Sequence, residues 1–248
     1  MIAQTVLLLL LIVSYPFWER YEIGTLKDST EPDARVKSYR RTILYQWGVA
    51  LVLALLVGPR TLARPPAALA GVSGPTSEFL VTAAPALLAG LLAPVLLAKS
   101  NPALRKKLEA SFASIAYYLP RTGRERALFA LVCVTAGVCE EIIFRGWIIR
   151  YLAALPAGLT LWGSLGVSAA LFGLVHLYQG WRGVALTAVL GGLLGFLFLN
   201  TGSLIVPIVL HVLIDLRALL LMPRTAAVGA ESAGGRRGGE GNADANTV

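Results

Sequence analysis

The chain has 248 residues, of which 56% are hydrophobic and only 15% are charged, and its formal net charge is +8. So few charges and a mean hydropathy of +0.69 exclude an ordinary soluble domain, in which about a quarter of the residues are charged. No basic stripe interleaved with aromatic residues is present, so the positive charge indicates loops that face anionic lipid rather than a nucleic-acid surface.

The first apolar stretch, MIAQTVLLLLLIVSYPFWER, is similar in length to a signal peptide. It lacks a basic start, and no A-x-A cleavage site follows its apolar run. Phe17 and Trp18 at its end are typical of a membrane interface. We therefore expect an uncleaved first span.

A membrane-spanning helix needs about 20 mostly apolar residues. Seven candidates lie at 2–18, 43–58, 79–98, 127–151, 158–178, 183–200 and 203–222. The basic segment 99–126 alternates apolar and basic residues, which predicts a short interfacial helix. The sequence predicts an all-α, multi-pass transmembrane helical bundle of about seven spans. Gly191 and Gly195, four residues apart, would let the sixth span approach a neighbour closely.

Composition divides the chain into three parts. Residues 1–126 form an N-terminal membrane region with three spans, 127–222 a core with four spans, and 223–248 a Gly- and Ala-rich tail that we expect to be disordered. With seven spans, 17 lysines and arginines lie in the loops on one side, and three lie on the other, counting Arg150 at the end of the fourth span. Because cytoplasmic loops carry the excess of these residues, we expect a cell-membrane protein with its N-terminus outside and its C-terminus in the cytoplasm.

Ionisable side chains within the predicted spans are confined to the last four, which include the chain's two histidines. The set is Glu140, Glu141, Arg145, His176, His211, Asp215 and Arg217. Such groups cost about 2.5–3.5 kcal/mol each at membrane depth even on lenient scales, so they are functional candidates by default. One cavity between the fourth, fifth and seventh spans could satisfy all of them.

Helical spacing sorts these residues into pairs. Glu141 and Arg145 lie four apart and can pair on one face, whereas Glu140 has no local cation and must find its partner on another helix. His211 and Asp215 also lie four apart, so the carboxylate can orient the imidazole.

A glutamate, an aspartate and two histidines are compatible with hydrolysis, because a carboxylate in a dry pocket can act as a general base and histidines can stabilise an oxyanion or bind a metal. Either a metal-held water or a water activated directly by glutamate would serve. The motifs H-E-x-x-H and G-x-S-x-G are absent. A thiol nucleophile at Cys139 stays open, although a thiol in an apolar span ionises poorly.

Three motifs resemble those of the CAAX protease and bacteriocin-processing (CPBP, Abi-type) family. They are EEIIFR (140–145), FGLVH (172–176) and HVLID (211–215), in the forms E-E-x-x-x-R, F-x-x-x-H and H-x-x-x-N or H-x-x-x-D. Their order within hydrophobic spans makes the resemblance specific over residues 127–220. It implies an all-helical intramembrane protease, whose prenyl-processing members remove the last three residues of a CAAX sequence. Those members tend to have asparagine where this chain has Asp215.

The resemblance also implies roles for the motif residues. Glu140 would activate the water with His176 beside it, and His211 with Asp215 would complete the site or stabilise the oxyanion. Supporting residues would be Glu141, Arg145 and Phe172. Zinc or another divalent metal, if required, would bind Glu140, His176 and His211. The implied partners are the lipid bilayer and a peptide or membrane-protein substrate, prenylated or bacteriocin-like.

Two other classes of function fit some of these features. A non-proteolytic membrane scaffold or immunity protein could use the same fold to bind a partner, and a proton-coupled transporter could use carboxylates and histidines as a relay. The complete set of catalytic-type residues argues against a scaffold. The lack of inverted repeats with broken helices argues against a transporter. We therefore expect an intramembrane endopeptidase.

Overall fold

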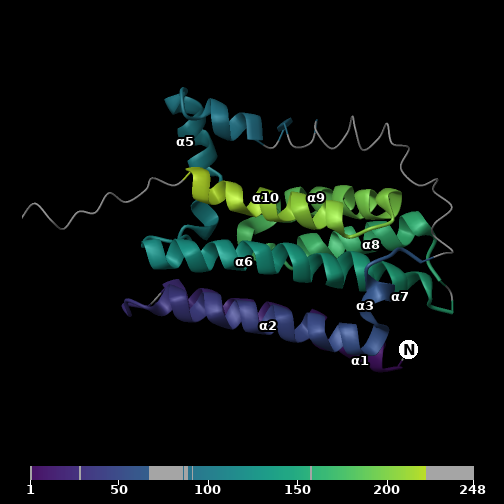
Figure 1. The fold of residues 1–248 in the computed structure, drawn as a ribbon. Coiled ribbons are helices and arrows are strands. Elements are labelled where there is room, and N and C mark those ends of the chain that lie inside the picture. The colour runs from purple at the N-terminus through teal and green to yellow at the C-terminus, as the bar shows by residue number, and fades with distance from the viewer. Residues whose placement is uncertain are drawn as a thin grey trace, which may run out of the picture.

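The computed structural model describes residues 2–27, 29–66, 86, 89–90, 92–156 and 158–221. Every regular element in these ranges is helical, which confirms the all-α prediction, and Figure 1 shows the long helices running alongside one another. The α-helices are α1 (Ile2–Lys27), α2 (Ala34–Val57), α3 (Pro59–Leu62), α5 (Pro102–Ala110), α6 (Gly123–Glu141), α7 (Ile149–Ala153), α8 (Leu161–Leu174), α9 (Gly180–Thr201) and α10 (Ile205–Leu221). Three short elements complete them, the 3-10 turns η2 (Ala113–Ile115) and η4 (Leu177–Gln179) and the π-helix η3 (Ile142–Ile148).

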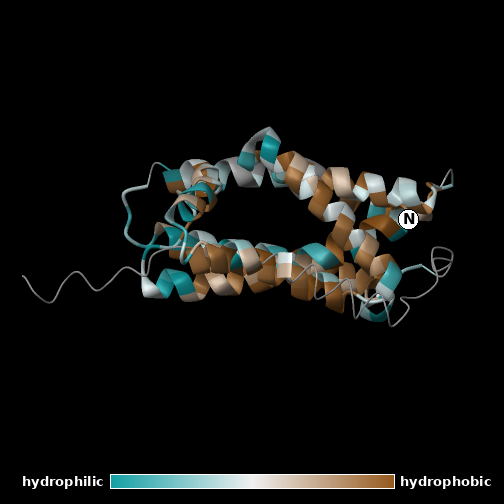
Figure 2. Cartoon of the chain, turned by 90° about the horizontal axis from the view of Figure 1, so that it is seen from above, coloured by the Kyte–Doolittle hydropathy of each residue, from teal (hydrophilic) through white to brown (hydrophobic). Residues whose placement is uncertain are grey.

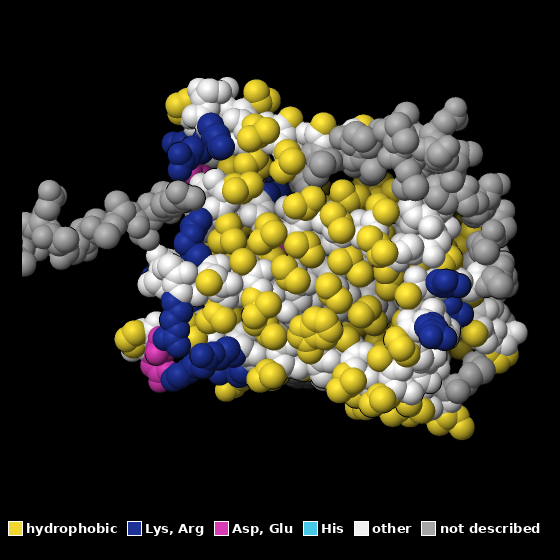
Figure 3. Space-filling view, in the orientation of Figure 1, with side chains coloured by type: hydrophobic (Ala, Val, Ile, Leu, Met, Phe, Trp, Pro, Cys, Tyr) yellow, Lys and Arg dark blue, Asp and Glu magenta, His cyan; other side chains and the backbone are white. Residues whose placement is uncertain are grey.

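The described helices are those of a membrane protein. Ala34–Val57, Gly123–Ala153 and Leu177–Thr201 are long and apolar enough to cross a bilayer, and Ile2–Leu11 and Leu161–Leu174 are shorter apolar helices. In Figure 2 hydrophobic residues follow the helices along much of their length, and Figure 3 shows a broad apolar surface between Lys and Arg side chains at the two ends. The count of seven spans stays a prediction.

Two segments of the sequence-based prediction lie wholly or largely outside the described residues. The third predicted span, 79–98, is described only at 86, 89–90 and 92–98, and the tail 223–248 is not described at all. The predicted helix within 99–126 is present as α5, whose first turn is capped by Asn101 through the backbone N–H of Leu104. Its place at the membrane interface stays a prediction.

The first helix extends further than the predicted span 2–18, because α1 continues to Lys27. Glu22 explains this extension, since its buried carboxylate accepts hydrogen bonds from Ser38 Oγ and Arg41 Nε of α2, each at 2.7 Å. A charge-assisted contact between two helices stabilises both where they meet. Much of the polar segment 19–42 is therefore helical rather than a loop.

Small residues bring the helices of the last four predicted spans together. An added Cβ at Gly191 would lie 2.9 Å from Cδ1 of Phe172 on α8, and one at Gly195 would overlap Leu165 of the same helix. This confirms that α9 approaches a neighbour closely at both glycines. Gly137 likewise lets α6 approach α10 closely, because an added Cβ there would overlap Val212. The three motif-bearing segments are thereby drawn to one place.

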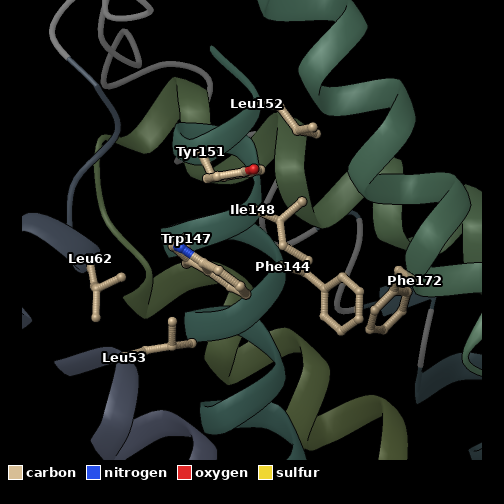
Figure 4. Packing of buried hydrophobic residues seen from close by; sticks show 8 residues of the cluster. All are labelled: Leu53, Leu62, Phe144, Trp147, Ile148, Tyr151, Leu152 and Phe172. Carbon is tan, nitrogen blue, oxygen red and sulfur yellow. The ribbon is translucent and has the colours of Figure 1, made fainter. Parts of the chain in front are cut away.

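A cluster of buried apolar side chains packs around η3 and the end of α8 (Figure 4). Its members are Leu53, Leu62, Phe144, Trp147, Ile148, Tyr151, Leu152 and Phe172. Trp147 is fully buried and Leu62 brings its backbone against Gly146, where a Cβ would lie 2.6 Å from the Leu62 carbonyl oxygen. The π-helix η3 is therefore held by close packing on several sides.

Candidate active site

The candidate site begins where α6 changes into the π-helix η3. Glu140 and Glu141 are the last two residues of α6, and Arg145 lies within η3. A π-helical turn accommodates an extra residue and re-aims the side chains around it, which is why such turns are frequent at functional sites. The sequence carries no proline or glycine pair that could have predicted this change of helix type.

Glu141 is the central acceptor of the site and is completely buried. Its Oε1 lies 2.9 Å from Nη1 of Arg145, which confirms the predicted pair, and 2.8 Å from Nδ1 of His211 on α10. The contact with His211 was not predicted. Because the carboxylate engages Nδ1, it fixes the orientation of the imidazole ring.

Arg145 is also buried, with 1% of its surface exposed. Its Nη2 donates to the carbonyl oxygen of Gly191 on α9 at 3.1 Å, and its guanidinium carbon lies 4.4 Å from the centre of the Phe172 ring on α8. Cation–π contacts of this kind are strongest where water is excluded. Arg145 thus joins η3 to both α8 and α9.

Glu140 lies beside Glu141 but makes different contacts. Its Oε1 accepts a hydrogen bond from Nε2 of Gln46 on α2 at 3.0 Å, and its Oε2 lies 3.8 Å from Nε2 of His211. The prediction that Glu140 finds its partners on other helices is confirmed. Glu140 Oε2 is buried and accepts no hydrogen bond within the described parts of the chain.

Asp215 lies one turn after His211 on α10, and its Oδ2 is 3.7 Å from the histidine Nε2. The two side chains share a helix face as their spacing predicts. The Nε2 of His211 therefore faces two carboxylates, Glu140 and Asp215, while its Nδ1 is held by Glu141.

The prediction that His176 lies within a membrane-spanning helix is wrong. Helix α8 ends at Leu174, and His176 lies in the turn that leads into η4. The backbone tightens here, because the N–H of His176 bonds three residues back to Gly173, and Gly180, at φ 79°, then begins α9.

The structure does place His176 beside Phe172, as predicted. Nδ1 of His176 is 2.7 Å from the Phe172 carbonyl oxygen, and the two rings are 4.8 Å apart. The Phe172 ring also meets the His211 ring edge to face at 5.8 Å. Phe172 therefore lies against both histidines and Arg145.

The described residues do not fit the zinc site that the motifs allow. Nowhere in these ranges are three or more His, Cys, Asp or Glu side chains gathered as ligands for a metal ion. In the set Glu140, His176 and His211, both histidines have Nδ1 engaged, by the Phe172 carbonyl and by Glu141, so only Nε2 of each ring is left to face a ligand.

A cavity of about 60 Å³ opens beside Glu140. Its walls come from α1, α2, the end of α6, η3 and the end of α8, and they are apolar except for Glu140, Gln46, Tyr15 and Tyr45. This cavity differs from the predicted one between the fourth, fifth and seventh spans, because α1 and α2 line it, no described residue of α10 does, and Glu140 alone of the predicted ionisable set borders it. Gln46 was the missed residue, although an amide inside the apolar candidate span 43–58 was a visible signal.

Residues 123–217 match the family described as type II CAAX prenyl endopeptidase, Rce1-like. No curated protein and no solved structure matches the chain. The matched segment contains all three motifs, with Arg145 and His211 that contact Glu141, which confirms the resemblance found in the sequence. The chain is thus a helical membrane protein whose residues 123–217 match a CAAX protease (CPBP) family domain.

Proposed function

We propose that the protein is an intramembrane endopeptidase in which Glu140 activates a water molecule directly. The observation that carries this proposal is the buried Oε2 of Glu140, which has no hydrogen-bond partner within the described residues, in a side chain that borders an apolar cavity. A buried carboxylate oxygen of this kind calls for a partner, and water is the partner that hydrolysis needs. The family match favours this function over a scaffold or a transporter.

The positions of the side chains support the following reaction. Glu140 takes a proton from the water as the oxygen attacks the carbonyl carbon of the peptide bond. The proton then passes to the leaving nitrogen, the C–N bond breaks, and the products are a carboxylic acid and an amine. Each transfer by a positioned side chain contributes about 10²- to 10⁴-fold to the rate.

His211 stabilises the negative charge that forms on the carbonyl oxygen. In its doubly protonated form the ring donates from Nδ1 to Glu141 and from Nε2 toward the site, where Asp215 also lies. A donor held in place before the reaction stabilises an oxyanion without reorganisation. Phe172 lies against both histidine rings and orients them, and His176 lies behind it in the chain turn where it can contact the substrate.

The substrate is a peptide or membrane protein with an apolar group, such as a prenylated or bacteriocin-like peptide. The apolar walls of the cavity beside Glu140, which include Leu8, Val49 and Leu171, support this class of substrate. An apolar chain gains about 0.8 kcal/mol for each CH₂ that it buries. Water-soluble polar peptides would gain nothing from these walls.

The end of the molecule where α2 and α6 begin faces the cytoplasm of the cell membrane. The basic segments 19–42 and 99–126 meet at this end, since Arg35 donates to the Tyr117 carbonyl oxygen at 3.0 Å and lies 3.9 Å from Glu125. Lys and Arg side chains gather there in Figure 3. By the positive-inside rule, the N-terminus would be outside and the C-terminus in the cytoplasm.

The test is peptide cleavage by the purified, full-length protein in liposomes, with a library of lipidated and unmodified membrane peptides. Wild-type protein is compared with Glu140→Gln, which keeps the shape of the side chain and removes the base. Cys139→Ala is the matched control at the neighbouring position. The proposal predicts cleavage by wild type and by Cys139→Ala and none by Glu140→Gln. Equal cleavage by Glu140→Gln would overturn it.

A further inference from the structure

Gln46 lies outside the family domain, yet it is the residue that holds Glu140. It belongs to α2, is 6% exposed, and donates from Nε2 to Glu140 Oε1 at 3.0 Å. This hydrogen bond engages one oxygen of the carboxylate and leaves the other, Oε2, without a hydrogen-bond partner in the described ranges, 3.8 Å from Nε2 of His211. Gln46 therefore decides which oxygen of Glu140 can act as the base.

A second feature of Gln46 points to a ligand. Its Oε1 and Glu140 Oε2 are both buried, and neither has a hydrogen-bond partner within the described ranges. Leaving such an atom unsatisfied costs about 1–3 kcal/mol, so each one requires a partner. Both side chains line the cavity of about 60 Å³, and a water molecule needs only about 10–15 Å³ of such space.

We propose that Gln46 is the water-binding residue of the active site, and this inference rests on the proposed protease function. The water donates one hydrogen to Gln46 Oε1 and the other to Glu140 Oε2. Its lone pairs then point away from both acceptors, toward the position of the substrate's carbonyl carbon. Glu140 takes the proton, and Gln46 keeps the oxygen in line for the attack.

The plainer explanation is that Gln46 only fastens α2 to α6. The chain offers a matched control, because the next residue, Trp47, makes another hydrogen bond between the same helices. Its Nε1 donates to Oγ1 of Thr135, which is fully buried, at 3.2 Å. Thr135→Val removes that bond with little change of shape, and Gln46→Met does the same for Gln46.

The kinetic test compares these two variants with wild type in liposomes. For Gln46→Met we expect kcat to fall about 100-fold with KM within threefold of wild type, because misplacing a reacting atom by about 1 Å costs that much. For Thr135→Val we expect kcat within threefold of wild type. Equal losses in the two variants, or a Gln46→Met kcat within threefold of wild type, would overturn the proposal.

A structural measurement tests the water site without relying on activity. High-resolution structures of the full-length wild type and of Gln46→Met are compared at Gln46 and Glu140. We expect an ordered water within hydrogen-bonding distance of both side-chain oxygens in wild type, and its loss in the variant. A wild-type structure without that water refutes the inference. If wild type cleaves nothing, the proposed function fails, and the wild-type structure alone still decides whether Gln46 binds water.

Discussion

Glu140 and Glu141 are neighbours in sequence, and the structure predicts opposite consequences when each is replaced by glutamine. Glu141 Oε1 meets both Arg145 Nη1 and His211 Nδ1 within 2.9 Å, and all three side chains are at least 96% buried. Glu140 accepts one hydrogen bond, from a neutral amide. Glu141→Gln should therefore destabilise the fold, and Glu140→Gln should abolish cleavage.

The loss of stability in Glu141→Gln depends on the contacts that Arg145 keeps. Removing one partner of a buried ion pair costs about 3–5 kcal/mol, because the other charge is left unpaired. In Glu141→Gln, Arg145 keeps the Gly191 carbonyl oxygen and the Phe172 ring, and a desolvated cation–π contact gives about 2 kcal/mol. We expect a loss near the lower limit, about 3 kcal/mol, which is roughly 100-fold in the folding equilibrium.

The assay is equilibrium unfolding of the purified protein in mixed detergent micelles, followed by the loss of helical signal. Glu140→Gln should unfold within about 1 kcal/mol of wild type. A double-mutant cycle that joins Glu141→Gln with Arg145→Met should give a coupling energy above 1 kcal/mol. The reasoning is refuted if Glu141→Gln costs less than 1 kcal/mol, or if Glu140→Gln costs as much as Glu141→Gln.

The remaining predictions concern helix contact, the thiol and the metal. In thermal unfolding, Gly191→Ala should lower the free energy of unfolding by about 1–3 kcal/mol, because its Cβ would lie 2.9 Å from the buried Phe172 ring. The control Gly192→Ala should be neutral or stabilising, because its Cβ would meet only Ala169, at 3.8 Å. Cys139→Ala should keep kcat within threefold, and a large loss of peptide cleavage would support the thiol mechanism. Treatment with a strong zinc chelator should leave cleavage unchanged, and restoration of lost activity by added zinc would contradict the glutamate mechanism.

The sequence predicts those parts of the site that local spacing determines. The Glu141–Arg145 pair and the shared face of His211 and Asp215 follow from four-residue helical periodicity, and both are present. The contact between Glu141 and His211 joins residues 70 positions apart, so no local period could predict it. The position of His176 was wrong for a similar reason, since an apolar run does not reveal where a helix ends when the chain turns through η4.

The cavity beside Glu140 includes residues outside the matched segment 123–217, so that segment alone does not account for the whole candidate site. The three motifs supply the carboxylates and histidines, but they lie in residues 140–215, and the cavity beside Glu140 is closed by α1 and α2. A base in an apolar pocket needs a wall to exclude bulk water and a polar atom to hold the one water it uses. Leu8 and Val49 belong to that wall, and Gln46 brings the polar atom. Related chains with the same motifs and different N-terminal helices would therefore share the bond-breaking step and differ in the substrates that reach it.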